Sequence, residues 1–431
     1  RLGSRRVSRY RFRHIVFQNY LYNSLDLVER AHLHEEVGTV LEALHADDTQ
    51  EIALSLARHF QEAGITNKAI EYLYQAGIRA VRMSANQEAV AHFTRSLELL
   101  NSVPKTTDCL QRELDLQVAL GVPLVLTRGH AAREVEQTYA RARELSAQIG
   151  GTPQLFHVLL GLRRYYLHCG RLQTARELGE ELITLAERSR DASQEEGALQ
   201  LSRAHAMHAE ILYCLGEFVQ AREHAQQGVR LFAPQRRRDH VLLYGNDTSV
   251  ISGIHEALAL WHLGHPNHAL EIARDMLDRS RELAHAFTLT VALFFTAMLY
   301  QLRRDIKNVQ ALSNELLRIA DEQGFALYLA WGTVLLGWAL GEEEREEEGI
   351  SHMRKGIDGL DAIGVIRMQP YYRALLAQAY ARVGRAHDGM DLLSKALALA
   401  EQTGECTFEA EIYRLQGELV KRQLDDAVGK I

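Results

Sequence analysis

The sequence predicts an all-α protein, a right-handed superhelical solenoid of helical hairpins that repeat about every 40 residues. Three observations lead to this prediction. Apolar residues recur at helical spacing along most of the chain, and no alternating strand pattern stands out. The 431 residues include only six prolines, and 47% of them are hydrophobic. Between residues 264 and 404 the sequence aligns with itself at a fixed period, which is typical of solenoids built from repeated hairpins.

The period is visible at three positions of the repeat. One lies near the start of a predicted helix, one lies where such a helix ends, and one lies in the short turn between helices. In that order, the residues are Ala269, Val309, Gly349 and Gly389; Gly324, Gly364 and Gly404; and Gly264, Arg304, Glu344 and Gly384. Each predicted hairpin carries two apolar stripes that it cannot cover alone, so the hairpins are expected to stack on one another.

Length and patterning suggest a division of the chain. A single compact core rarely holds this many residues, so we expect an extended array. Residues 1–45 are predicted to be the remnant of a linker segment, and residues 46–431 the solenoid. Within the solenoid we expect N-terminal repeats over 46–104, repeats of about 40 residues over 105–404, and a capping helix with a tail over 405–431. Because the chain does not begin with methionine, we expect it to be a piece of a longer protein.

Composition argues against several classes of function. The net charge of −7 gives no general attraction to nucleic acid. The arginines among residues 1–13 could contact nucleic acid, although the edge of a neighbouring domain is the better interpretation. The four cysteines are far apart and form no CxxC motif, which favours buried thiols in a reducing, cytoplasmic compartment. No apolar run is long enough to span a bilayer, so no membrane contact is expected.

No motif for catalysis or metal binding appears in the sequence. The chain lacks HExxH, GxSxG, a glycine-rich phosphate loop and a cysteine cluster, so we expect neither an enzyme nor a bound cofactor. The spacing of His262, His265 and His268 invites a metal hypothesis, but Gly264 and Pro266 place these residues around a turn. His205 and His208 have no third ligand nearby in the sequence. Turn and surface histidines are the preferred interpretation of both groups.

A resemblance to a known family covers nearly the whole chain. Phe12-Arg13-His14, Gln18, Tyr22, Ser24-Leu25, Arg30, His32 and Leu33 resemble the end of the winged-helix segment of bacterial STAND-class signalling ATPases. The run over 56–80, followed by Ala89, His92 and Phe93, resembles the first tetratricopeptide repeat of the same proteins, as does Leu243-Tyr244-Gly245 later in the chain. The resemblance implies a tetratricopeptide-like solenoid preceded by a P-loop ATPase, in proteins often fused to a class III nucleotide cyclase or a DNA-binding domain. The chain itself has no GxxxxGK[ST] loop.

In tetratricopeptide arrays the first helix of each hairpin lines a concave groove, and the resemblance implies the same here. The residues projected onto this inner face are His157, Arg164, His168, Arg203, Glu210, Tyr213, Ile254, Leu258, Trp261, His262, Val291, Phe294, Met298, Gln301, Trp331, Val334, Trp338, Tyr371, Gln378 and Arg382. Our candidate groove site comprises eight of them: Arg164, Tyr213, Trp261, His262, Phe294, Trp331, Trp338 and Tyr371. Two alternatives remain open: these side chains form an exposed surface that binds a ligand, or the solenoid coils tightly and they pack together.

A second candidate site is a loop that interrupts the period. Between Ala221 and Ala269 the spacing lengthens to 48 residues, and the extra residues fit the segment 233–247. Insertions in solenoids often lie on a binding face, so Arg236, Arg237, His240 and Tyr244 are candidates for contact with a ligand or partner. The alternative is a tolerated surface excursion.

These observations predict a non-catalytic regulatory module that binds a ligand or a protein, the sensor arm of a larger signal-transduction ATPase. Its expected partners are a protein or a small-molecule effector in the concave groove, and its own upstream ATPase domain. The alternative is an interaction scaffold that mediates partner binding or self-assembly without a small-molecule ligand. A closed cavity would favour the first hypothesis and an open groove with polar rims the second.

Overall fold

The computed structural model describes residues 14–46, 48–83, 85–151, 153–237, 241 and 245–428. All regular secondary structure within these ranges is helical, which confirms the predicted all-α class. Contacts divide the chain into two compact units, unit 1 with residues 1–127 and 137–155, and unit 2 with residues 128–136 and 156–431. The domain boundaries predicted near residues 45, 104 and 404 were placed by the sequence repeats and do not correspond to the limits of these two units. They remain predictions.

Unit 1 begins with α1 and α2 and is built around the hairpin of α3 and α4. Its helices, two of which continue past its limits, are α1 (Ile15–Ser24), α2 (Leu27–Leu44), η1 (Gln50–Ile52), α3 (Ala53–Glu62), α4 (Thr66–Arg82), α5 (Asn86–Leu100), α6 (Thr107–Arg128) and α7 (Arg133–Ile149). Leu56 and Phe60 of α3 and Leu73 of α4 are buried in one apolar cluster, where the Phe60 ring stacks on Tyr72. Spacings of about four residues place such side chains on one helical face.

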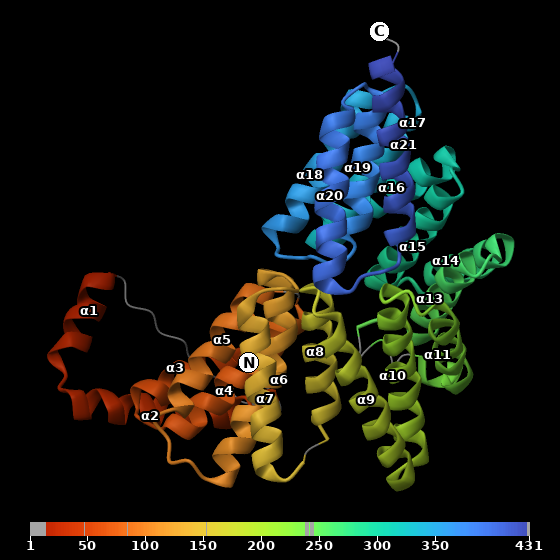
Figure 1. Ribbon diagram of the computed structural model, residues 1–431. Helices are drawn as coiled ribbons and strands as arrows, with labels where there is room; N and C mark the ends of the chain where they lie inside the picture. The colour runs from red at the N-terminus through yellow and green to blue at the C-terminus, as the bar shows by residue number, and fades with distance from the viewer. Residues whose placement is uncertain are drawn as a thin grey trace. The chain divides into compact units, whose positions relative to one another are not determined.

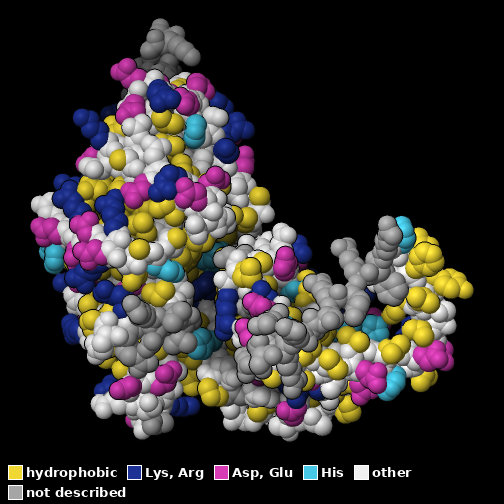
Figure 2. Space-filling model, turned by 180° about the vertical axis from the view of Figure 1, so that it is seen from behind, with side chains coloured by type: hydrophobic (Ala, Val, Ile, Leu, Met, Phe, Trp, Pro, Cys, Tyr) yellow, Lys and Arg dark blue, Asp and Glu magenta, His cyan; other side chains and the backbone are white. Residues whose placement is uncertain are grey.

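The surface of α1 and α2 is unusually apolar. Ile15, Phe17 and Tyr20 of α1 and Leu27 and Val28 of α2 are all exposed. Figure 2 shows hydrophobic side chains at this end of unit 1, at the right edge of the view. The start of α2 is nevertheless well defined, since Asp26 caps it and pairs with Glu29 in a capping box. Exposed apolar surface of this kind marks an interaction site in many soluble proteins.

Unit 2 is a series of helical hairpins followed by one last helix (Figure 1). The hairpins are α8 (Leu155–His168) with α9 (Leu172–Ala192), α10 (Gln194–Cys214) with α11 (Phe218–Leu231), α13 (Thr248–His262) with α14 (Pro266–Leu283), α15 (Ala286–Leu302) with α16 (Ile306–Gln323), α17 (Ala326–Glu342) with α18 (Glu346–Ala362), and α19 (Gln369–Arg382) with α20 (Ala386–Thr403); η2 (Pro234–Arg236) precedes α13, and α21 (Glu409–Val428) ends the unit. The second helices of the last four hairpins begin 40 residues apart, in agreement with the sequence period.

The periodic residues have distinct structural roles. The four residues at helix starts are buried, and two of them are glycines because the helix axes approach closely. A methyl group on Gly349 would lie 2.5 Å from the carbonyl oxygen of Gly337 and 2.7 Å from the amide nitrogen of Gly341 on the facing helix α17. Gly324 and Gly404 end α16 and α20 in the left-handed conformation. The turn residues Gly264, Arg304, Glu344 and Gly384 all have positive φ.

Segments that are distant in sequence meet inside unit 2. The amide of Ile366, in the turn between α18 and α19, donates to the carbonyl of His168 at the end of α8 (2.8 Å). In the turn between α20 and α21, the amide of Cys406 donates to the carbonyl of Cys214 (3.0 Å). The hydroxyl of Thr407 in the same turn donates to the backbone carbonyl of Tyr213 (2.8 Å). Both carbonyls lie at the end of α10. Unit 2 therefore coils tightly enough for its last hairpins to contact its first ones.

Candidate functional site

The inner helices of unit 2 converge on a narrow polar cavity. Helices α8, α10, α13, α15 and α17 all contribute to its wall, together with the turn between α18 and α19. The side chains that line it are His130, Arg163, Arg164, Leu167, His168, Arg203, Met207, Glu210, Asn246, Ile251, His255, Phe287, Val291, Phe295, Tyr328 and Arg367. About 50 Å³ of it is open to the centre of a water molecule. A cavity rich in arginine and histidine is unusual in the interior of a helical solenoid, where apolar side chains normally pack.

Glu210 is the hub of the ion pairs in this cavity. Its carboxylate accepts from Nη2 of Arg163 at 2.5 Å and from Nη1 of Arg367 at 2.7 Å. Arg163 also donates to the carbonyl of Met207 at 2.8 Å. Burial by itself would raise the pKa of Glu210, but the guanidinium groups of Arg367 and Arg163 hold it well below its ordinary value. Glu210 is therefore ionised, and it joins α8, α10 and the Arg367 turn.

Arg203 and the loop before α13 form a second polar cluster. Nη1 of Arg203 donates to Oδ1 of Asn246 at 2.5 Å. The next residue, Asp247, caps α13 by accepting from the amides of Ser249 and Val250. Asp247 also forms an ion pair with Arg237, whose Nε lies 2.8 Å from Oδ2 of Asp247. The end of the inserted loop thus reaches the cavity through Asn246, while Arg237 is engaged by the capping aspartate beside it.

Two histidines in the wall are buried and neutral. Burial, together with Arg367 and Arg163, lowers the pKa of His255 to about 4, although Glu210 acts in the opposite direction from 3.9 Å. Burial and the charges of His130, Arg367 and Arg164 likewise hold the pKa of His168 well below its usual value. Both shifts have the direction expected for a site with positive electrostatic potential.

Aromatic side chains flank the cavity. Trp331 of α17 is 1% exposed and stacks on Phe294, with ring centroids 4.6 Å apart. The guanidinium of Arg367 lies over the Trp331 ring at 5.6 Å from its centroid, within the range of a cation–π interaction. The ring of His168 lies 6.4 Å from that of Trp331. Trp331 therefore contacts two of the side chains that line the cavity, Arg367 and His168.

The structure brings only part of the predicted groove site together at this cavity. Arg164 lines it directly, and Phe294 and Trp331 pack beside it. The remaining predicted residues lie elsewhere: Tyr213, Trp338 and Tyr371 are buried, whereas Trp261 and His262 are partly exposed. Of the predicted loop residues, Arg237 is described above and Arg236 belongs to η2, but the Arg236 side chain, His240 and Tyr244 lie outside the described part of the chain.

Several lining residues were not among the eight predicted groove residues. The projection onto the inner face named His168, Arg203 and Glu210, but it chose Arg164 and missed its neighbour Arg163, the more buried of the two. It also missed His255, Asn246 and Arg367. An arginine that directly follows the apolar run 158–162 is a signal that could have identified Arg163. Arg367 lies in a turn between helices, where helical periodicity carries no information about burial.

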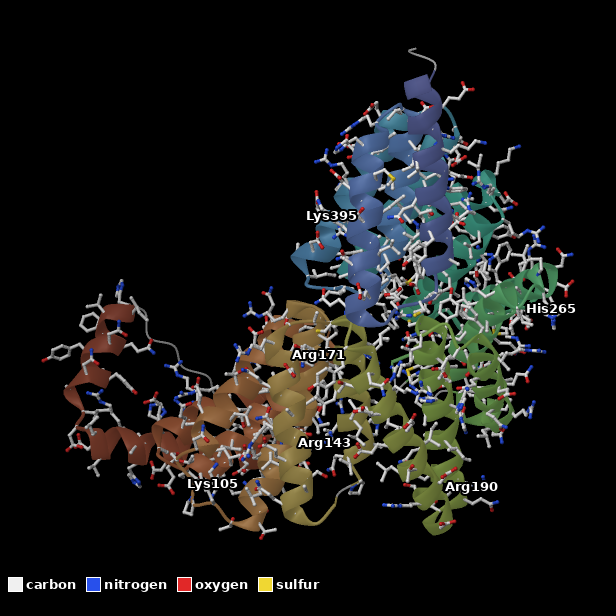
Figure 3. The ribbon with its side chains drawn as sticks, in the orientation of Figure 1. Lys105, Arg143, Arg171, Arg190, His265 and Lys395 are labelled. Atoms are coloured by element: carbon white, nitrogen blue, oxygen red, sulfur yellow. The ribbon has the colours of Figure 1, made fainter. Side chains whose placement is uncertain are left out.

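The histidine groups considered from sequence are placed by the structure. His265 lies exposed in the turn between α13 and α14 (Figure 3). Helix α11 brings His224 to the pair His205 and His208, with Nδ1 of His205 and Nδ1 of His224 2.9 Å apart. Within the described ranges, no group of three or more His, Cys, Asp or Glu residues has the geometry to hold a metal ion. No described helix is long and apolar enough to cross a membrane.

Comparison with known proteins shows the fold of the chain. No protein-family model matches it. An uncharacterized protein of Rhizobium meliloti (strain 1021) is 22% identical over 416 residues, which cover 96% of this chain, and the chain spans only 40% of that protein's length. The solved structure of a Rap protein complexed with Competence and Sporulation Factor has a TM-score of 0.51 and 14% identity, over 83% of this chain and 99% of that chain. The apo quorum sensor NprR from B. thuringiensis has a TM-score of 0.53 and 13% identity, over 80% and 92%. The fold is a tetratricopeptide-like solenoid.

Proposed function

We propose that this chain is a non-catalytic recognition module that binds a partner or effector and thereby regulates a larger signalling protein. The observation that carries the proposal is the arginine-rich cavity at which five inner helices and the Arg367 turn meet. A buried polar site inside an otherwise apolar solenoid is costly to maintain, and ligand recognition explains why it is kept. Two proteins of similar fold, the Rap protein solved with Competence and Sporulation Factor and the quorum sensor NprR, support the same class of function.

Binding at this cavity would act on the arrangement of the helices around it. Glu210 joins α8 and α10 to a turn that lies 157 residues further along the chain. A ligand that contacts both sides favours the arrangement in which they are close, and it shifts the equilibrium only by its differential affinity for the two states. We further propose that the regulated partner is a STAND-class ATPase segment of the same protein. The resemblance of the N-terminal residues and the greater length of the R. meliloti relative support this.

A protein-interaction scaffold is the second candidate function. The exposed apolar side chains of α1 and α2, including Phe17 and Tyr20, favour it because such surfaces usually contact another protein. In this alternative the polar cavity is a structural feature of unit 2, and partner binding occurs on unit 1. A cytoplasmic location suits both candidates.

Intrinsic tryptophan fluorescence of the 431-residue chain distinguishes the two candidates. The chain is titrated separately with the small-molecule and the macromolecular fractions of a cell extract. A saturable change with the small-molecule fraction, abolished in Trp331→Phe but retained in Trp261→Phe, is the result expected for effector recognition. A response only to the macromolecular fraction would favour the scaffold. No change in fluorescence with either fraction, while the chain is folded, would contradict the proposed function.

A further inference from the structure

The buried charges around the cavity do not balance. Arg163 and Arg367 are each at most 3% exposed, and a guanidinium keeps its charge in a protein. Partly exposed Arg164 adds a third cation to the wall. Among the described lining residues, Glu210 is the one carboxylate that faces them. Uncompensated charge in a buried site is strongly unfavourable, so an additional negative group would stabilise this arrangement.

The nearest further carboxyl group does not supply that charge. Glu405 accepts a hydrogen bond from the amide of Met368 at 3.0 Å, beside Arg367 in the chain. Burial raises its pKa to about 7, so near neutral pH much of this side chain is protonated. Asp247, another buried carboxylate among the described residues of this region, is engaged by Arg237 and by the amides at the start of α13.

Hydrogen-bond donors remain unused in the same place. Nε and Nη2 of Arg367 and Nε of Arg163 are buried and have no hydrogen-bond partner among the described residues. Nδ1 of His168, which donates or accepts according to the tautomer of the ring, is also buried and without such a partner. Buried guanidinium N–H groups are normally satisfied, because each unmet donor costs free energy. Several unmet donors around one cavity therefore indicate a ligand that carries acceptor oxygens.

The size of the cavity limits that ligand. A single water molecule needs roughly 10–15 Å³ of space measured for its centre, and this cavity offers about 50 Å³. It can therefore hold three or four atoms the size of oxygen, comparable to a carboxylate or a phosphate group. We propose that the cavity of unit 2 binds a compact oxyanion, a carboxylate or phosphate group, held by Arg163, Arg164 and Arg367 opposite Glu210. The planar guanidinium groups present paired donors that suit either oxyanion.

The inference is tested by the thermal unfolding midpoint of the 431-residue chain in sodium phosphate, sodium acetate and sodium chloride at equal ionic strength and pH. A ligand that binds only the folded state raises the midpoint in a saturable manner. We expect this rise with phosphate, acetate or both, but not with chloride. A response to phosphate alone assigns the site to a phosphate group, and a response to acetate alone assigns it to a carboxylate. No rise beyond that in chloride would overturn the inference.

Variants locate the effect. Arg164→Gln changes a partly exposed side chain, so the fold should tolerate it, and we expect roughly a tenfold or greater loss of apparent affinity because one charged hydrogen bond is removed. Arg318→Gln is the matched control, since Arg318 lies exposed on α16 and pairs with Glu322. Arg367→Gln is a second cavity variant, but Arg164→Gln is decisive if the Arg367 variant does not fold. Equal affinity in the Arg164 and Arg318 variants would place the anion elsewhere and overturn the inference.

The biological meaning of this site rests on the proposed recognition function, but the two proposals fail separately. If phosphate and acetate are without effect while the small-molecule fraction still changes the Trp331 fluorescence, the oxyanion site is wrong and effector recognition stands. If an anion binds through Arg164 while neither extract fraction gives a signal, the oxyanion site stands and the proposed function is wrong.

Discussion

Glu405 shows how one buried residue links protonation to the stability of unit 2. The side chain is 3% exposed and accepts from the amide of Met368. Its pKa rises from an ordinary value of 4.5 to about 7 on folding, because burial penalises the charged form. Between these two values the folded state binds more protons than the unfolded state. The stabilisation is therefore complete below about pH 4.5 and is lost as the pH rises through about 7.

The variant Glu405→Gln tests this linkage. The amide oxygen of glutamine still accepts the Met368 hydrogen bond but does not titrate. From pH 5 to pH 8 we expect the free energy of unfolding of the unaltered chain to fall relative to that of the variant, by at most about 3 kcal/mol at 1.36 kcal/mol per pKa unit. Urea unfolding at both pH values measures the difference. Glu401→Gln, an exposed position on α20, should leave the pH dependence unchanged; parallel pH profiles for Glu405→Gln would contradict the linkage.

The packing of α17 against α18 depends on a glycine at the repeat position 349. Replacing Gly349 with alanine should separate the two helices, because the new methyl group would meet backbone atoms of α17 that cannot move aside as a side chain can. We expect a loss of roughly 1–3 kcal/mol in the free energy of unfolding, measured by urea denaturation.

Gly359→Ala in the same helix is the control for this substitution. Its methyl group would meet the Ala330 side chain at 3.4 Å, an ordinary contact. Alanine also has the higher helix propensity, by up to about 1 kcal/mol. Opposite signs for the two substitutions would show that the close approach of α17 and α18, and not glycine itself, determines the result at Gly349. Equal effects would contradict that explanation.

The turns within the hairpins share one backbone conformation whatever residue occupies them. Glu344 has a φ of 63° where the equivalent Gly264 has 85°, and a non-glycine residue is strained in this region. Glu344→Gly should therefore stabilise the chain, by about 0.5 kcal/mol after the greater flexibility of unfolded glycine is subtracted. Gly264→Ala should destabilise it by about 1 kcal/mol, since no atom lies within 4 Å of the added methyl group and only the backbone strain remains. Thermal unfolding of both variants measures this; a destabilised Glu344→Gly would show that the strain is relieved elsewhere.

At the scale of unit 2, the sequence predicted the repeating hairpins and left open whether they coil tightly. Period and apolar spacing depend on neighbouring residues, so the hairpins and the short turns between their helices could be inferred from sequence. The cavity could not be inferred from sequence. Its wall joins Arg163 to Arg367, and their proximity results from small rotations summed over several hairpins. Both Arg163 and Arg164 line the cavity, but the projection onto the inner face named only Arg164.

The hydrogen bonds from the Ile366 and Cys406 turns to α8 and α10 also affect how the chain folds. A solenoid with contacts only between neighbouring repeats can begin folding anywhere and propagate in either direction. Here partners separated by 157 and 194 residues must meet, which adds non-local contacts and slows folding. During synthesis on the ribosome, the ends of α8 and α10 lack these partners until the last hairpins have emerged. The polar interior of unit 2 is therefore completed only when almost all of unit 2 has been made.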